Sequence, residues 1–175
     1  VQAKKRFGKY PFVSYNVYDA DKDPAAQGYD PGSFDIVIAS DVIHATKSIA
    51  ETIGNARKLL APGGVLAMLE VTKAPIYLEL IFGMTEGWWA FEDLDLRPVH
   101  CSLSTKAWMN VLPDLGFDDV VALADDPESK RTSQTVFLCR NEQYEYEEEL
   151  KREIDPGKWL VFADTKGFGT ALIEG

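Results

Sequence analysis

Two short apolar runs joined by a helix-length segment constrain the fold of this chain more than any other feature. The runs cover residues 34–39 (Phe-Asp-Ile-Val-Ile-Ala) and 65–71 (Val-Leu-Ala-Met-Leu-Glu-Val), and the second has too little polarity for a strand that is exposed on either face. Between them, apolar residues recur every third or fourth position, which predicts an amphipathic helix over residues 47–60. Pro62-Gly63-Gly64 is expected to end that helix. The pattern is that of a βαβ unit, so we expect an α/β fold with a parallel sheet.

A histidine and a glutamate stand at the ends of the two expected strands. His44 follows the first strand in a polar turn, and Glu70 is the one charge in the second strand. In open α/β sheets, ligands bind at the carboxyl ends of the parallel strands. A buried carboxylate that accepts a hydrogen bond from one imidazole nitrogen leaves the other nitrogen able to take a proton. The two residues are therefore a candidate acid–base pair, and the alternative is a structural histidine in an apolar setting.

The segments before this unit predict three further elements. Residues 1–8 resemble the end of a helix with basic side chains in its last turns. Residues 10–18 alternate weakly between apolar and polar side chains, which predicts a strand. Residues 22–33 are rich in proline and glycine and predict a loop, with a short helical turn at residues 25–27.

The segments after the unit predict two helices and a hairpin. A short apolar helix is expected at residues 76–82, followed by the aromatic segment 87–89. A longer helix should cover residues 104–116, capped by the serine at its start and the glycine at its end. Residues 120–124 and 135–139 then predict a closing hairpin that completes the sheet.

The C-terminal part divides the chain into a core, a linker and a second unit. Residues 141–157 are strongly acidic with few apolar positions, which indicates a solvated linker. Residues 158–175 begin with a new apolar run and predict one strand and a helix start of another α/β unit. We therefore assign residues 1–140 to the core domain.

Charge and cysteine content exclude several classes of protein. The formal net charge of −10 argues against binding to a nucleic-acid backbone, which requires a basic face. Cys101 and Cys139 lack the spacing of a metal site or a disulfide framework, so a reduced, cytoplasmic setting is expected. No apolar run approaches the roughly 20 residues needed to cross a bilayer, and we expect no membrane partner.

Three other features allow a functional or a structural interpretation. Asp19 either caps a turn or accepts a hydrogen bond from the exocyclic amine of a nucleoside. Trp88 and Trp89 either form core under a lid or make an apolar wall for an acyl chain. The segment Gly167-Phe168-Gly169 lacks the third glycine of a dinucleotide loop, so it is weak support for such a site.

Taken together, these segments resemble the C-methyltransferase domain of modular and reducing polyketide synthases. The resemblance covers residues 1–140 and rests on motifs that occur in family order: His44-Ala45-Thr46, Pro62-Gly63-Gly64, Leu69-Glu70 and Gly87-Trp88-Trp89. It implies the Rossmann-like sheet of the class I methyltransferases, incomplete at its N-terminal side.

The resemblance also implies a reaction. The methyl donor would be S-adenosylmethionine, with S-adenosylhomocysteine (SAH) as product. The substrate would be a β-ketoacyl chain linked through phosphopantetheine to an acyl carrier protein, and neighbouring synthase domains would be further partners. His44 would remove the α-proton and Glu70 would orient and stabilise His44. Neither residue would need a metal.

Binding residues follow from the same resemblance. Asp19 and Ala20 match the family's acidic position near adenine. Ser40 and Asp41 match the strand end that approaches the methionine part, although Asp41 stands where an asparagine is expected. The proposed substrate wall consists of Phe82, Trp88 and Trp89.

Two departures from the family pattern affect these expectations. The glycine-rich loop and the ribose-binding acid of the family would precede residues 1–8, so this chain alone is expected to bind the cofactor weakly or not at all. Residues 158–175 resemble the start of a ketoreductase region, in its structural half. The alternatives are a small-molecule O-methyltransferase, which also uses a histidine base, and a non-catalytic scaffold domain within a synthase.

Overall fold

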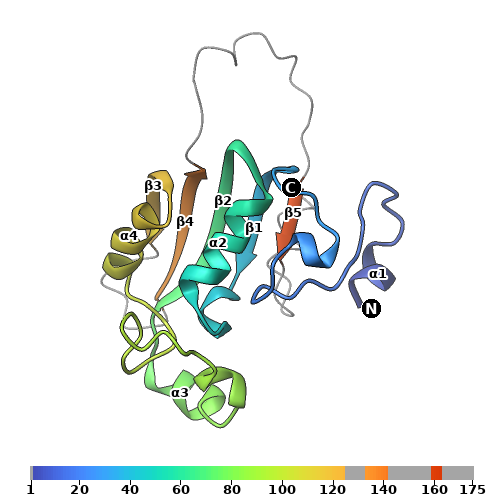
Figure 1. Ribbon diagram of the computed structural model, residues 1–175. Helices are drawn as coiled ribbons and strands as arrows, with labels where there is room; N and C mark the ends of the chain where they lie inside the picture. The colour runs from blue at the N-terminus through green and yellow to red at the C-terminus, as the bar shows by residue number, and fades with distance from the viewer. Residues whose placement is uncertain (1, 125–132, 142–158, 163–175) are drawn as a thin grey trace.

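In the computed structural model, which describes residues 2–124, 133–141 and 159–162, the sheet is mixed and has five strands (Figure 1). Their order is β3-β4-β2-β1-β5. β1 pairs in parallel with β2 and β5, whereas β4 pairs antiparallel with β2 and β3. The bounds are β1 (Phe34–Ser40), β2 (Leu60–Lys73), β3 (Phe117–Ala124), β4 (Ser133–Asn141) and β5 (Trp159–Phe162). The expected βαβ unit and the closing hairpin are both confirmed.

Helix α2 (Ile49–Leu59) connects the two central parallel strands. It starts two residues later than the apolar spacing predicts, because Ser48 is its N-cap and the Ser48 hydroxyl accepts a hydrogen bond from the Glu51 N–H at 3.3 Å. One apolar side of the helix is buried against the sheet, as the spacing predicts.

The Pro62-Gly63-Gly64 segment lies inside β2 and not before it. The register between β1 and β2 shifts at this point, so Phe34 pairs with Leu60 but Ile36 pairs with Val65. A Cβ atom at Gly64 would lie 3.0 Å from the Asp35 carbonyl oxygen, which is closer than such atoms normally approach. The segment therefore forms a bulge in place of the expected turn. Within this bulge, only glycine fits at position 64.

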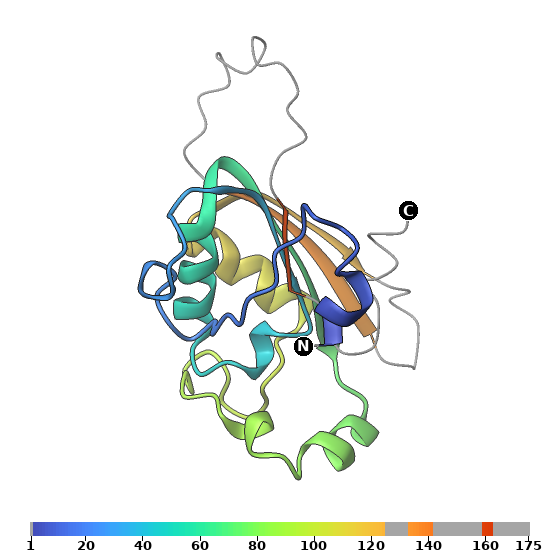
Figure 2. The ribbon, with the colours of Figure 1, turned by 90° about the vertical axis from the view of Figure 1, so that its right-hand side faces the viewer.

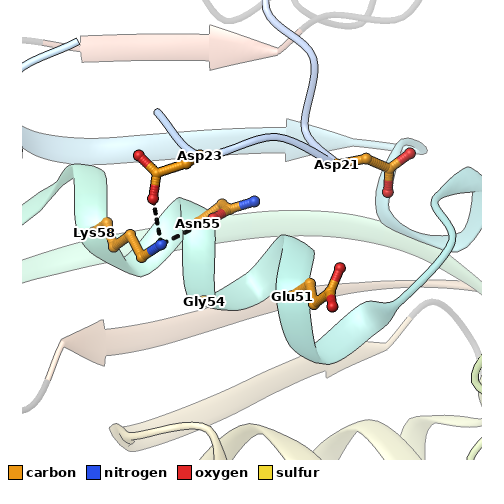
Figure 3. A pocket seen from close by; sticks show the side chains of 6 residues that line it. All are labelled: Asp21, Asp23, Glu51, Gly54, Asn55 and Lys58. Atoms are coloured by element: carbon orange, nitrogen blue, oxygen red, sulfur yellow. Dashed lines mark hydrogen bonds and ion pairs between the residues drawn. The ribbon is translucent and has the colours of Figure 1, made fainter. Parts of the chain in front are cut away.

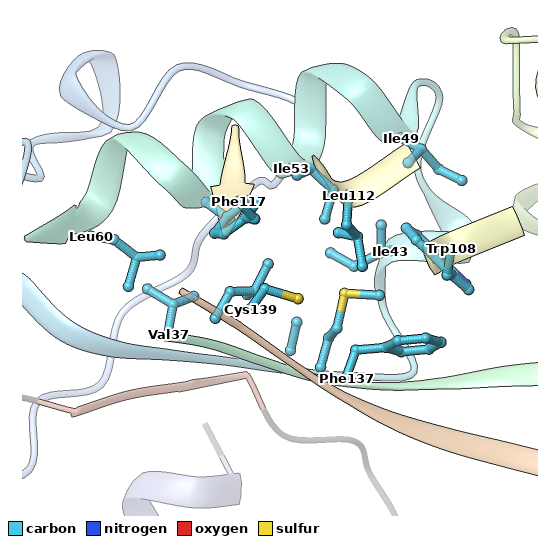
Figure 4. Packing of buried hydrophobic residues seen from close by; sticks show 14 of the residues in the cluster. Val37, Ile43, Ile49, Ile53, Leu60, Trp108, Leu112, Phe117, Phe137 and Cys139 are labelled. Atoms are coloured by element: carbon cyan, nitrogen blue, oxygen red, sulfur yellow. The ribbon is translucent and has the colours of Figure 1, made fainter. Parts of the chain in front are cut away.

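The core lies on one face of the sheet, under α2 and α4 (Thr105–Asp114). Figure 2 shows both helices on the same side of the sheet, and Figure 4 shows their apolar side chains meeting those of the strands. Burial of each such side chain contributes roughly 1.5–3 kcal/mol. The expectation that the strand at 65–71 is covered on both faces is met in part, since its residues alternate between buried and half-buried up to Leu69, and Glu70 and Val71 are both buried. Among the described residues, the helices that bury the core are α2 and α4, and both cover the same face of the sheet. The buried core includes Val37, Ile49, Ile53, Leu66, Met68, Trp108, Leu112, Phe117 and Phe137.

The segment at residues 10–18 forms no strand in the described structure, which corrects the sequence-based expectation. Phe12 and Val17 are 80% and 96% exposed, so these two apolar side chains do not enter the core. The expected helix at the N-terminus is present as α1 (Gln2–Phe7), and the short turn is present as η1 (Ala25–Gln27).

The region between β2 and α4 contains α3 (Ile76–Phe82) and η3 (Glu86–Trp89), which Figure 1 places beyond the end of β2. Ser104 caps α4, and Gly116 follows that helix with φ +86°, as a glycine after a helix end often does. Within the described ranges, no helix has the length and apolar character needed to cross a membrane.

At the C-terminal side, Asn141 is the last residue of β4, and the rest of the expected linker lies outside the described residues. The strand expected after the linker is present as β5, where Ile36 pairs with Trp159 and Ala39 with Phe162. The glycine-containing segment at 167–169 also lies outside the described residues. The division into core, linker and second unit remains a prediction.

Candidate active site

His44 and Glu70 meet at the carboxyl end of the two central parallel strands. His44 lies in η2 (Ile43–Ala45), just after β1, and Glu70 is a fully buried residue of β2. His44 Nδ1 is 2.7 Å from Glu70 Oε2. The other carboxylate oxygen, Oε1, accepts hydrogen bonds from the backbone N–H groups of Ile43 at 2.8 Å and Val42 at 3.3 Å. Glu70 therefore binds both the histidine side chain and the backbone of the turn that carries it.

The surroundings of His44 determine its basicity. Burial by itself would lower the pKa of His44, but the hydrogen bond and the charge of Glu70, together with the charge of Asp41, raise that pKa above its ordinary value. The Nδ1 atom faces the carboxylate, and Nε2 has no hydrogen-bond partner in the described ranges. The side chain is 14% exposed. A neutral His44 with its proton on Nδ1 can therefore accept a proton at Nε2, and Glu70 stabilises the cation that results.

An aromatic group stands beside His44. Trp88 is buried, and its ring meets the His44 ring edge-on with 6.0 Å between centroids. Phe82 stacks on Trp88 at 5.5 Å. Trp89 is 52% exposed, and its indole N–H donates to the Gly83 carbonyl at 2.8 Å. The structure thus brings Trp88 to His44, with Phe82 stacked on Trp88, and leaves Trp89 outside this group.

Ser40 and Asp41 lie at the end of β1, next to His44. The Ser40 hydroxyl is buried and has no hydrogen-bond partner within the described part of the chain. Asp41 has φ +49°, a left-handed conformation that aspartate and asparagine tolerate better than most residues. Its N–H donates to the Leu69 carbonyl at 2.8 Å, and its Oδ2 accepts from Gln134 at 3.0 Å. The strand end therefore presents a buried hydroxyl, that of Ser40, to which no described residue is hydrogen-bonded.

Asp19 and Ala20 are placed less directly. The Asp19 carboxylate is partly exposed and forms an ion pair with Lys22 at 2.8 Å. Ala20 lines a small apolar hollow that Ala39 and Val42 also line. The segment that contains Asp19 and Ala20 consequently runs beside the end of β1.

The side chains of Asp41, His44 and Glu70 offer potential metal-ligand atoms that all lie within 4.8 Å of one another. Both carboxylate oxygens of Glu70 already accept hydrogen bonds from His44 and from the backbone of the turn. These hydrogen bonds explain why the side chains of His44 and Glu70 lie close together. The expectation that the reaction needs no metal remains a prediction.

A second hollow of about 340 Å³ opens between α2 and the loop before β1 (Figure 3). It is acidic, but the carboxylates of Asp21 and Asp23 already have partners in the protein. Asp23 pairs with Lys58 at 2.6 Å, and Asp21 accepts from the Lys47 N–H at 3.0 Å. The hollow therefore reflects how the loop is attached to α2. It is lined by Asp21, Asp23, Glu51, Gly54, Asn55 and Lys58.

Two residues near His44 were not identified from the sequence. Arg97 is fully buried and donates to the His44 carbonyl at 2.9 Å. His100 meets the other side of Trp88 edge-on at 5.5 Å and pairs with Glu79. The only sequence signal for Arg97 is its spacing of four from Asp93, which is common on exposed helices and does not indicate burial.

The comparisons with known proteins find methyltransferases and polyketide synthases. The family described as "Methyltransferase domain" matches residues 1–66. Highly reducing polyketide synthase 40 of Fusarium pseudograminearum is 37% identical over 140 residues, which make up 79% of this chain and 5% of that synthase. The solved structure of the CurJ carbon methyltransferase is 38% identical with a TM-score of 0.74, over 79% of this chain and 38% of that chain. The trans-methyltransferase CalH in complex with SAH is 34% identical with a TM-score of 0.72, over 79% of this chain and 38% of that chain.

The chain thus spans a small part of the synthases that it matches and less than two fifths of the solved methyltransferases. Within that part, the fold inferred from the sequence is confirmed as that of a class I methyltransferase with a partial, mixed sheet. The matched part of the chain thus has the class I methyltransferase fold, and its homologues are the carbon methyltransferase domains of polyketide synthases.

Proposed function

We propose that this chain is part of a C-methyltransferase that methylates the α-carbon of a β-ketoacyl thioester on an acyl carrier protein. The observation that carries the proposal is the 2.7 Å contact between His44 Nδ1 and the buried Glu70 carboxylate. The names of the homologues support a carbon acceptor within a polyketide synthase. The carrier protein and the neighbouring synthase domains are proposed as partners on the same ground.

His44 acts as the general base. Its Nε2 removes the α-proton, which the adjacent ketone and thioester carbonyls make acidic. Glu70 keeps the other imidazole proton on Nδ1 and stabilises the imidazolium that forms. General-base assistance of this kind contributes on the order of 10²–10⁴-fold in rate.

The residues at the end of β1 fit the methyl donor of the family. S-adenosylmethionine supplies the methyl group that the deprotonated carbon accepts. Ser40 offers a buried hydroxyl that has no hydrogen-bond partner among the described residues, which is the kind of group that a polar ligand satisfies. Asp41, Asp19 and Ala20 are proposed as further contacts along the same edge. The Lys22–Asp19 ion pair is exposed, so Asp19 can exchange Lys22 for a ligand at little cost in free energy.

Phe82 and Trp88 form the proposed apolar wall for the acyl chain. Their stacked rings stand next to His44, where they exclude water from the base. Trp89 remains a proposed contact at the outer edge of this wall, since half of its surface is exposed.

The test is methyl transfer to a β-ketoacyl carrier protein by the full-length protein. His44→Ala should lower turnover by about 10²–10⁴-fold and leave binding of S-adenosylmethionine, measured by calorimetry, nearly unchanged. The control is Asn110→Ala, which shortens an exposed polar side chain of α4 and should keep most of the turnover.

Three results would contradict the proposal. Wild-type turnover of His44→Ala would exclude His44 as the base. Methylation of a phenol or acid oxygen in place of the β-ketoacyl carbon would favour a small-molecule O-methyltransferase. Absence of S-adenosylmethionine binding by the full-length protein would favour a non-catalytic scaffold domain.

A further inference from the structure

Arg97 is a buried cation that binds the backbone of the turn carrying His44. Its side chain is 0% exposed. Nη1 donates to the His44 carbonyl at 2.9 Å, and Nη2 donates to the carbonyls of Thr46 at 2.9 Å and Lys47 at 3.0 Å. Nη1 also reaches the Cys101 carbonyl at 3.4 Å. The guanidinium therefore satisfies a set of carbonyls that neither a helix nor a strand ladder satisfies.

Asp93 connects Arg97 to the start of α2. Its Oδ1 accepts from Arg97 Nε, and its Oδ2 accepts from the Ile49 N–H at 2.9 Å. The ring of Phe91 covers the guanidinium at 5.1 Å from its centroid. A buried charge is tolerated when it is paired and fully hydrogen-bonded, and both conditions hold for Arg97. All five guanidinium N–H groups have an acceptor within reach.

Glu70 and Arg97 bind the same turn through opposite groups. The carboxylate of Glu70 accepts from the N–H groups of Val42 and Ile43, whereas Arg97 donates to the carbonyls of His44 and Thr46. The backbone before His44 is held by an anion, and the backbone from His44 onward is held by a cation. Two independent anchors leave the His44 Cα with little freedom to move relative to Glu70.

From this arrangement we propose that Arg97 is a positioning residue for the reaction, which keeps His44 Nδ1 in contact with Glu70 by anchoring the His44 carbonyl. The proposal rests on the proposed role of His44 as the base. A displacement of about 1 Å at a reacting group can cost 10²-fold in rate, so anchoring of the turn has a direct effect on turnover. The charge of Arg97 by itself lowers the pKa of His44, and Arg97→Lys keeps that charge. When the charge is kept, a purely structural arginine would affect the stability of the fold and not the titration of His44.

The variant that separates these roles is Arg97→Lys. Lysine keeps the positive charge, but its three donors lie on one nitrogen and cannot reach carbonyls spread over the whole turn. The chain has two histidines, so the imidazole signals of His44 and His100 can be separated by NMR. We expect the Nδ1 proton of His44 to lose its protection from exchange in Arg97→Lys. The pKa of His44 should fall toward its ordinary value, because the Glu70 contact that raises it is loosened.

In the full-length protein, Arg97→Lys should lower kcat by about 10–10²-fold and change KM by less than about twofold. The matched control is Arg57→Lys at the far end of α2, where Arg57 Nε donates to Asn141 Oδ1 at 3.0 Å. This variant also shortens an arginine that joins two elements, yet it should leave the titration of His44 and the value of kcat unchanged.

An unchanged titration of His44 in folded Arg97→Lys would overturn the proposal. Should that variant fail to fold, Asp93→Asn decides the question, since it keeps Arg97 and removes only its ion pair. It should shift the His44 titration in the same direction by a smaller amount, and an unchanged titration there would also overturn the proposal. The NMR result is independent of activity, so it separates failure of this proposal from failure of the proposed methyl transfer.

Discussion

His44 Nδ1 lies 2.7 Å from Glu70 Oε2, although the two residues are 26 positions apart in the chain. The parallel register produces this contact, because Ser40 at the end of β1 pairs with Leu69, the residue before Glu70. A turn of four residues then brings His44 back over the strand end. The geometry is therefore a property of the βαβ unit, and it predicts a specific dependence of stability on pH.

The first prediction concerns Glu70→Gln. In the wild type the pKa of folded His44 is raised, so its contribution to the free energy of unfolding is fully present below the unfolded pKa of about 6.5 and is lost as pH rises through the folded pKa. In Glu70→Gln the burial of His44 dominates and lowers its pKa. The contribution of His44 should then reverse sign, so that it destabilises the fold increasingly as pH falls below the unfolded pKa of about 6.5 and vanishes at high pH. Urea unfolding at several values between about pH 5 and pH 9 measures this change.

The control for that experiment is Glu86→Gln, which removes an exposed carboxylate from the same region of the chain. It should unfold with the pH dependence of the wild type. A Glu70→Gln profile parallel to that of the wild type would show that the carboxylate does not control the titration of His44.

The second prediction contrasts two glycines. A Cβ at Gly64 would meet the backbone oxygens of Ala61, Asp35 and Phe34 at 2.9–3.2 Å, so Gly64→Ala should destabilise the chain by about 1–3 kcal/mol. Gly54 lies in α2 with open space around its Cβ position, so Gly54→Ala should stabilise the chain by about 0.5–1 kcal/mol. Urea unfolding of the two variants measures both changes in the free energy of unfolding. Equal effects of the two substitutions would contradict the bulge in β2.

The third prediction concerns the two cysteines. Burial raises the pKa of Cys101 to about 11 and that of Cys139 to about 12, and both residues are fully buried. Since the thiolate is the reactive form, neither should react with Ellman's reagent at pH 8 in the folded chain, and both should react in urea. Ser14→Cys places a thiol at an exposed position and is the positive control. Rapid labelling of the folded wild type would contradict the burial of these residues.

The sequence by itself determined the elements that repeat over a short distance. The spacing of apolar residues located α2 and α4, the two apolar runs located β1 and β2, and Ser104 marked the start of α4. The pairing of His44 with Glu70 could also be inferred, because parallel strands place their carboxyl ends side by side. These features depend on backbone geometry and local hydrogen bonds, which neighbouring residues largely decide.

Only the tertiary structure decided which side chains are buried and what they contact. Trp88 and Trp89 are adjacent in sequence, yet Trp88 packs beside His44 while Trp89 is exposed. Residues 10–18 alternate like a strand but find no partner in the described sheet, and Arg97 gave no local sign that it is buried at the turn of His44. A strand needs a neighbouring edge, and a buried charge needs acceptors from distant segments. Such partners are set by how the whole chain packs, so the periodicity of a single segment cannot predict them.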